Sequence, residues 1–511
     1  MWIKPSHALG AALILGASHV CAETPLSAID WLSDSIAETA QVAPVTAVLD
    51  IAENAMPEIV SVFALGRATP DAIGLLPTSV TGLPANLWGN SSSADLAGRF
   101  RADRIDLYPA MQDLLYTLLL GEFDPPIDAG PEATLFLARI DTLLALGALD
   151  QADALLAQSD LDQPQIFRRA FDVSLLLRTE DKACETLRAT PALSPTFPAR
   201  IFCLARGGDW NAAALSLEIG RGLGYLSEGE VALLARFLDP VLFEDEPRLV
   251  PPARPSPLMF RILEALGEPL PTASMPRAYA HNDLQNNSGW KAQLEAAERL
   301  TRTGALDPNL LLGLYSERRP AASGGLWQRV QAVQSLEVAI SATDRAAISA
   351  ALPIAWREMS RAELEVPFAR FFSARLATEL RQTESAALVF EISMLSDDYE
   401  NAAFLYSPAD DRQLLLQAIA QGRAGNMRSN DPMLAAIQDG FRARGIPVRL
   451  QSLTREGRLG SAILRAMELF ANGSRGDLDQ LADALAFFRA VGLEDIARRA
   501  ALQLIVLERR G

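Results

Sequence analysis

The sequence predicts a mainly all-α protein, an α-solenoid of antiparallel helix pairs, with a short irregular or β-containing N-terminal region. Leu and Ala dominate the composition whereas Val, Ile, Tyr and Trp are sparse, and this balance favours helices over strands. From about residue 92 onward, apolar side chains recur with the helical period of 3.6 residues. A short turn motif also returns along the chain at similar intervals, as stacked helix pairs require.

Residues 1–22 have the form of a secretory signal peptide. Lys4 precedes a short apolar stretch, and small residues at Val20 and Ala22 predict cleavage after Ala22. A lipid anchor on Cys21 is the alternative, although the residues before it fit that pattern poorly. The apolar stretch is shorter than the about 20 residues that cross a bilayer. We therefore expect a periplasmic protein with no integral membrane span in the mature chain.

Residues 23–91 lack the repeated motif and form the predicted irregular N-terminal region. Within this region, residues 27–40 have the pattern of a short amphipathic helix, and residues 45–51 and 58–65 could form two short strands. The region ends in a stretch rich in Gly and Pro that contains Trp88. We interpret Trp88 as a packing anchor that seats this stretch on the helical body.

Residues 92–238 form the first predicted helical-repeat region. Asp150, Asp181 and Asp209 each follow a tight turn and precede an Ala-containing apolar stretch. An Asp at a helix start accepts backbone N–H groups and meets the positive end of the helix dipole. Over roughly residues 130–235 the pattern resembles tetratricopeptide-like repeats, although the Trp, Tyr and Pro positions of that family are largely missing. The resemblance implies a superhelix of paired helices.

The two cysteines of the predicted mature chain are Cys184 and Cys203. They lie on neighbouring predicted helices, at almost equal distances from the turn at residues 191–195. An antiparallel helix pair places them at the same height, and an oxidising compartment favours a disulfide between them.

Residues 239–280 form a predicted Pro-rich linker or ridge, because proline removes a backbone donor and bars a regular helix. Residues 281–511 form a second predicted helical-repeat region. Its last periodic segment, residues 478–507, resembles the capping pair of a solenoid.

The segment from residue 314 to 330 is the strongest candidate for a binding site. A Gly-Gly step before a helix exposes backbone N–H groups that can hold a carboxylate or phosphate, and nearby arginines strengthen such a site. The alternative is an ordinary N-capped loop in which the tryptophan fills the core. The candidate residues are Arg318, Arg319, Ser323, Gly324, Gly325, Trp327 and Arg329.

The composition argues against several classes of protein. The net charge of −17 disfavours nucleic acid as a partner. His281 is the one histidine left after signal cleavage, so a His-rich metal site is excluded, and we interpret His281 as a polar loop residue. No recognisable catalytic constellation is present, and we expect neither a metal nor a cofactor. The Glu384-Ser385 step resembles part of a periplasmic muramidase motif but lacks the Gly-rich segment that follows it there.

Residues 290–330 and the loop at 76–89 resemble an uncharacterised group of exported proteins from alphaproteobacteria. The expected function is that of a periplasmic, non-enzymatic scaffold or adaptor that binds an envelope protein or peptide and supports cell-envelope integrity. The alternatives are a carboxylate-dependent glycan or peptidoglycan hydrolase and an anion-binding or small-ligand-binding protein. The oligomeric state stays open.

Overall fold

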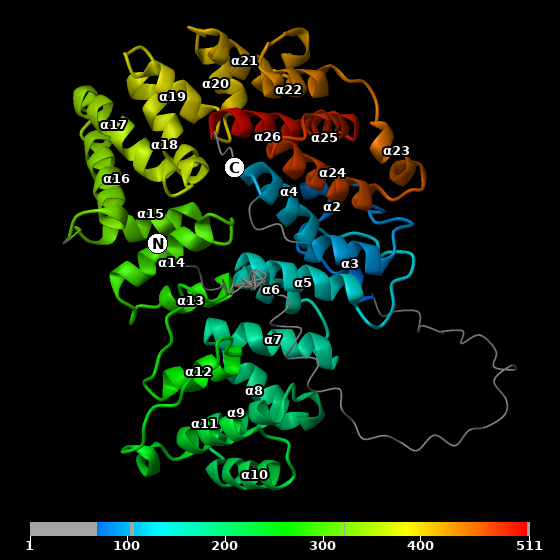
Figure 1. Ribbon diagram of the computed structural model, residues 1–511, viewed down its shortest axis with the longest axis vertical. Coiled ribbons are helices and arrows are strands. Elements are labelled where there is room, and N and C mark those ends of the chain that lie inside the picture. The colour runs from blue at the N-terminus through cyan, green and yellow to red at the C-terminus, as the bar shows by residue number, and fades with distance from the viewer. Residues whose placement is uncertain (1–68, 103–106, 321, 508–511) are drawn as a thin grey trace, which may run out of the picture.

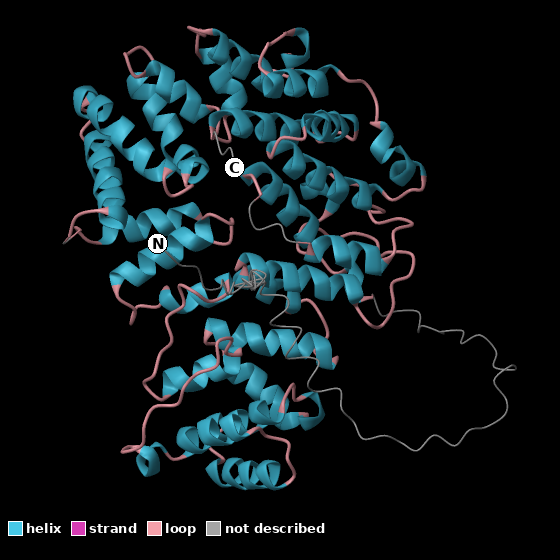
Figure 2. Cartoon of the chain, in the orientation of Figure 1, coloured by secondary structure: helices cyan, strands magenta, loops and turns pink. Residues whose placement is uncertain are grey.

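The computed structural model describes residues 69–102, 107–320 and 322–507, and the regular structure in these ranges is helical (Figure 2). Apart from one isolated bridge between Leu76 and Gly121, no β-structure occurs in them. The all-α prediction is thus confirmed for the described chain. The predicted signal peptide, the helix at 27–40 and both predicted strands lie outside the described residues.

The helices fall into three consecutive stretches. The first stretch comprises η1 (Pro70–Ala72), α2 (Thr78–Thr81), α3 (Ser93–Arg101), α4 (Pro109–Leu120), α5 (Thr134–Leu146) and α6 (Leu149–Leu156). The second comprises α7 (Pro164–Leu177), α8 (Glu180–Ala189), η2 (Pro191–Leu193), α9 (Phe197–Arg206), α10 (Trp210–Gly222), α11 (Glu228–Leu238), η3 (Pro240–Phe243) and α12 (Pro257–Ala265). The third comprises η4 (Arg277–Tyr279), α13 (Ala280–Asp283), α14 (Trp290–Thr301), α15 (Pro308–Glu317), α16 (Gly325–Ser341), α17 (Arg345–Ser360), α18 (Glu365–Leu380), α19 (Ala386–Ser393), α20 (Tyr399–Leu405), α21 (Asp411–Ala420), η5 (Ala424–Asn426), α22 (Pro432–Arg442), α23 (Val448–Arg455), α24 (Leu459–Ser474), α25 (Leu478–Ala490) and α26 (Glu494–Val506).

The repeated acidic residues lie at helix starts, as the turn motif predicts. Asp150 and Asp181 occupy the first turns of α6 and α8. Asp209 precedes α10 and accepts a hydrogen bond from the Ala212 N–H at 3.1 Å. Gly147 ends α5 with φ of +84°, a conformation that glycine adopts without steric cost. These local signals set the boundaries between successive helices.

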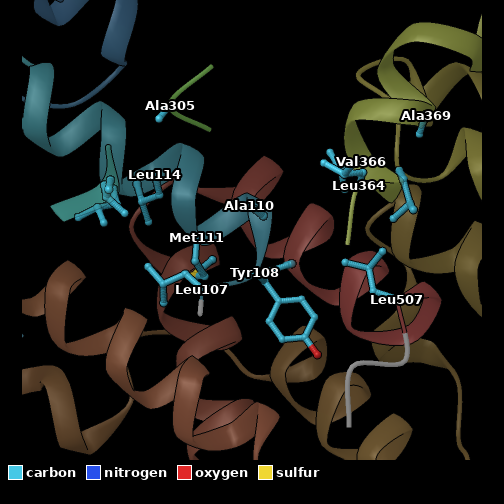
Figure 3. Packing of buried hydrophobic residues seen from close by; sticks show 14 of the residues in the cluster. Leu107, Tyr108, Ala110, Met111, Leu114, Ala305, Leu364, Val366, Ala369 and Leu507 are labelled. Carbon is cyan, nitrogen blue, oxygen red and sulfur yellow. The ribbon is translucent and has the colours of Figure 1, made fainter. Parts of the chain in front are cut away.

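The first and third stretches join into one unit, which we call the closed body (residues 69–157 and 277–507; Figure 1). Successive helices of the third stretch pack on one another, and the last of them return to the first stretch, where α26 contacts α4 and α24 contacts α3. The buried N–H of Ala110 donates to Gln503 Oε1 at 2.8 Å across this junction. Figure 3 shows Ala110 and Met111 of α4 in the same apolar cluster as Leu507, directly after α26. Helix α26, which belongs to the pair predicted as a cap, therefore packs against the first stretch.

Trp88 anchors the N-terminal loop at this junction, as its sequence context predicts. Its side chain is fully buried, with its ring centroid 5.9 Å from that of Phe100 and 5.5 Å from that of Phe123. A Cβ atom added at Gly460 on α24 would lie 2.3 Å from the Trp88 ring, so only glycine permits this approach. The Gly460 N–H also donates to the Leu87 carbonyl at 2.8 Å.

The second stretch, residues 164–266, forms a lobe with a hydrophobic core of its own. Helix α7 is shared, because Ile166 and Val173 enter the core of the closed body while Phe167 and Phe171 enter the core of the lobe. The proline-rich segment 239–280 carries η3, α12 and η4 between irregular stretches. The core of the closed body thus contains α3–α6, from the first predicted repeat region, together with helices of the second predicted repeat region, residues 281–511.

The predicted disulfide between Cys184 on α8 and Cys203 on α9 is present, with 4.9 Å between the Cα atoms. Both cysteines are buried in the lobe core. The disulfide therefore fastens two adjacent helices of the smaller unit.

Candidate functional site

A cavity of about 1390 Å³ lies inside the closed body, where segments distant in sequence meet. Its walls come from the start of α4, the loop before η4, the exposed side of α14 and the C-terminal end of α24. The charged groups on the walls are Arg277, Arg299, Arg302, Arg475, Asp283, Glu295 and Glu363. Closure of the helical path creates this cavity, since α4 and α24 belong to opposite ends of the described chain.

Arg299 supports one wall from α14. Its guanidinium donates to the carbonyl of Thr272 at 2.9 Å and to the carbonyl of Met275, and so it holds the loop before η4 in place. Burial lowers the pKa of Arg299, and the nearby charges of Arg277 and Arg302 lower it further. Within the described chain Arg299 has no carboxylate within ion-pair distance, and the charge of nearby Asp283 partly offsets these effects on its pKa.

Asp283 is the half-buried carboxyl of the cavity. The Thr272 hydroxyl donates a hydrogen bond to it, but burial dominates and raises the pKa of Asp283 above its ordinary value. Glu295 and Glu363 are exposed at the rim, and Glu295 pairs with Lys291 at 3.4 Å. Carboxyl groups and arginines therefore lie together both in the interior and at the rim of the cavity.

Two aromatic side chains form an apolar wall of the cavity. Tyr108, which precedes α4, and Phe470 on α24 meet edge to face with their ring centroids 5.8 Å apart. Alanines on α5, α13, α14 and α24 contribute to the lining, together with Leu107, Pro271 and Met275. The cavity consequently offers cationic groups and small apolar surfaces side by side.

The predicted anion-binding segment lies elsewhere, at the start of α16. Arg318 pairs with the adjacent Glu317 at 2.9 Å, and Arg319, Ser323, Gly324 and Gly325 are exposed. Gly324 and Gly325 have positive φ values of 88° and 50°, which fits the predicted tight turn. Trp327 is half-buried and its ring centroid lies 5.1 Å from that of Trp290. The exposed residues of the turn therefore stay a predicted site, and Trp327 packs as the alternative interpretation expects.

Arg329, the last candidate of that segment, belongs to a buried network. Its guanidinium donates hydrogen bonds to both carboxylate oxygens of Glu298, at 2.8 and 2.6 Å. The Tyr315 hydroxyl donates to the same carboxylate at 2.6 Å. Burial opposes the charge on Arg329, but the bonds to Glu298 outweigh this effect and raise the pKa of Arg329. Arg329 is thus directed into the protein, away from the exposed Gly-Gly turn.

His281 is not the polar loop residue that its sequence context suggests. It lies on α13, is 5% exposed, and one of its ring nitrogens is 2.6 Å from the carbonyl of Gly147. Burial lowers its pKa. Glu384 is exposed in the turn before α19 and does not line the cavity.

The described ranges contain no group of three or more His, Cys, Asp or Glu side chains arranged to hold a metal ion. None of the helices described is both long enough and apolar enough to cross a bilayer. Searches of protein-family models, curated proteins and solved structures returned no match to this chain. The geometry is therefore the basis for a functional proposal.

The cavity and its arginines were not predicted from the sequence. Arg299 and Arg302 have a spacing that places them on one side of a helix, a signal that was available. Arg277 lies in a segment predicted to be linker, and Arg475 is more than 170 residues farther along the chain. Only the return of α24 to the first stretch brings them together.

Proposed function

We propose that the protein is a non-catalytic adaptor of the bacterial cell envelope that holds a protein partner on the outer face of α10. The predicted signal peptide and the disulfide support an oxidising, periplasmic location. The successive antiparallel helices support a tetratricopeptide-like solenoid, in which exposed helix faces commonly serve recognition. A role in envelope integrity is what the resemblance in architecture to periplasmic tetratricopeptide-like proteins implies.

The observation that carries this proposal is a run of exposed apolar side chains on one helix. Leu215, Ile219 and Leu223 follow one another at intervals of four residues, which places them on one side of α10, and they are 63%, 46% and 63% exposed. Trp210 and Tyr225, at the two ends of α10, are also exposed, but Trp210 lies on another side of the helix, against Phe237, and Tyr225 lies against Phe197. Isolated exposed apolar residues are ordinary, but a contiguous run marks an interaction surface.

The position of α10 makes this face accessible. Helix α10 packs on α9 and α11 through Ala213, Leu217 and Gly220, and it lies at the edge of the lobe farthest from the closed body (Figure 1). A partner can therefore approach it without rearrangement of the closed body.

The surrounding charges indicate the chemistry of the partner. Residues 207–230 carry Asp209, Glu218, Glu228 and Glu230 but a single arginine, Arg221. A second copy of this acidic chain, or an anionic lipid surface, would be repelled. The face fits an amphipathic protein segment whose apolar residues are flanked by basic ones, and helix-to-helix packing is one established mode for such recognition.

The test starts with a photo-crosslinking residue at position 215, compared with one at exposed Val338 of the closed body, in intact cells. A partner captured only from position 215 is then purified and its affinity measured. We expect L215Q/I219Q/L223Q to weaken binding about tenfold or more. The matched variant L310Q/V338Q/I354Q, which changes exposed apolar residues of the closed body, should bind as the parent does.

Identical crosslinks from both positions would contradict the proposal. Unchanged affinity of the L215Q/I219Q/L223Q protein for the captured partner would do so as well. The hydrolase alternative is tested separately by incubating the purified chain with cell-wall sacculi. Glu384, the residue of the muramidase-like step, lies outside the cavity, whereas Asp283, Glu295 and Glu363 line it.

A further inference from the structure

We propose that the cavity of the closed body binds a short acidic peptide, with the ligand carboxylates facing the arginine side chains and its small apolar side chains lying on the alanines. This site is separate from the α10 face, and it goes beyond the adaptor function. It is also distinct from the Gly-Gly turn at the start of α16.

The charge of the cavity is the first step of the argument. Arg277 and Arg299 are half-buried, while Arg302 and Arg475 are exposed toward the mouth. Arg302 lies 3.9 Å from Glu298, but Arg329 already occupies both oxygens of that carboxylate. In the described chain Arg475 has no ion pair. Four arginines thus line the cavity from the mouth inward, beside the carboxyl groups of Asp283, Glu295 and Glu363, although the whole protein carries a net charge of −17.

The positions of Arg302 and Arg475 have a competing explanation, because each lies at the C-terminal end of a helix. Arg302 and Arg475 directly follow α14 and α24, where a cation complements the negative end of the helix dipole. That role would be met equally well by arginines dispersed over the surface. It does not explain why two helix ends, Arg277 and Arg299 converge on one cavity.

The size and the apolar lining select the class of anion. Ligand pockets commonly enclose about 300–1,000 Å³, so a cavity of about 1390 Å³ has room for more than one small anion. Ala145 and Ala292, together with Pro271 and Met275, add partly exposed apolar surface to its lining. Phosphate would leave these apolar surfaces uncovered. A peptide that alternates carboxylates with methyl groups covers both kinds of surface.

The acidic side chains at the rim limit the class of ligand further. Glu295 and Glu363 are exposed there and repel a ligand of uniformly high negative charge, such as nucleic acid. A short peptide can place its amino terminus near these carboxylates and its acidic side chains deeper. The distribution of charge therefore favours a peptide over a continuous polyanion.

The experiment measures binding of a labelled hexapeptide of alternating glutamate and alanine to the purified full chain. A glutamine–alanine hexapeptide, citrate and inorganic phosphate are the comparison ligands. The variant R302Q/R475Q removes the two mouth arginines without touching Arg299, which supports the wall. The matched variant R381Q/R455Q removes two exposed arginines at the ends of α18 and α23, outside the cavity.

We expect R302Q/R475Q to bind the acidic peptide about tenfold more weakly or worse, since charge-assisted hydrogen bonds are lost. R381Q/R455Q should stay within about twofold of the parent, because its arginines lie outside the cavity. A second variant, Ala292→Leu, fills part of the apolar lining without a charge change and should also weaken binding.

Equal losses in the two arginine variants would overturn the proposal, because they would indicate non-specific attraction. So would the absence of saturable peptide binding at millimolar concentration. Citrate or phosphate binding as tightly as the peptide would replace the proposal with a small-anion site.

Discussion

In the closed body the last helices pack on the first. In the lobe, α10 forms the outer edge, and one of its apolar sides is exposed. The described parts of both units are built from helices. Closure hides apolar faces at both ends of the helical path and leaves an open cavity with charged and apolar walls between them. The open lobe instead presents an apolar face outward. Whether the helical path closes thus decides what kind of surface each unit offers.

The two units also differ in how they are stabilised. The closed body has a large continuous core that reaches from Leu83 to Leu507. The lobe spans only about a hundred residues and has a much smaller core. A small domain buries a smaller fraction of its surface and is correspondingly less stable. The Cys184–Cys203 disulfide lies in the unit that most needs such support.

Substitution of Trp88 is expected to have the largest effect. Trp88→Ala removes a fully buried aromatic side chain where α24 packs on the first stretch, and should destabilise the closed body by about 4 kcal/mol. Hydrogen exchange measured by mass spectrometry should show lost protection in α3, α4 and α24, with α8 to α10 little changed.

The matched control is Trp210→Ala in the lobe, since Trp210 is 51% exposed. We expect its effect to stay below about 1 kcal/mol. Equal destabilisation by the two substitutions would mean that closure at Trp88 is not what holds the larger unit together.

Removal of the disulfide should destabilise the lobe and leave the closed body little changed. C184A/C203A releases a cross-link between residues separated by 19 positions, which the chain-entropy account values at about 3 kcal/mol. Protection from hydrogen exchange should fall in α7 to α12 and persist in α24 to α26. Reduction of the parent protein is the control, and it should reproduce the result without any loss of side-chain volume. Loss of protection throughout the chain would show that the lobe and the closed body unfold as one unit.

Local features of the fold could be predicted from the sequence. The helical period, the acidic helix starts and the spacing of Cys184 and Cys203 about a turn depend on neighbouring residues only. Trp88 was predicted as an anchor because a large aromatic residue in a Gly- and Pro-rich loop has few other ways to be buried. Its contacts with α24 were not predicted.

Features that depend on closure could not be predicted in the same way. The cavity combines Tyr108, Arg277, Arg299 and Arg475, and no local pattern relates them. The Gly-Gly turn was a strong local signal, but it carries no information on Glu298, the partner that engages Arg329 from another helix. Local chemistry identified a tight turn, whereas tertiary packing decided where its arginine points.

The smallest expected effect concerns α7, the helix shared by the two units. Burial raises the pKa of Asp172 from its ordinary 3.8 to about 6, against the opposing charges of Arg168 and Arg169. The native state then holds this proton more tightly than the unfolded chain, so the contribution of Asp172 lowers stability as pH rises from about 4 to about 6. Asp172→Asn should remove that loss. Since solvent reaches part of the side chain, we expect a gain of about 1 kcal/mol at pH 7 and almost none at pH 4.

Denaturant unfolding across this pH range is the measurement, and Glu185→Gln on exposed α8 surface is the control. Coupling through α7 predicts that the gain extends to protection in both α5 and α12, and a gain confined to α12 would show that the closed body is independent of the lobe.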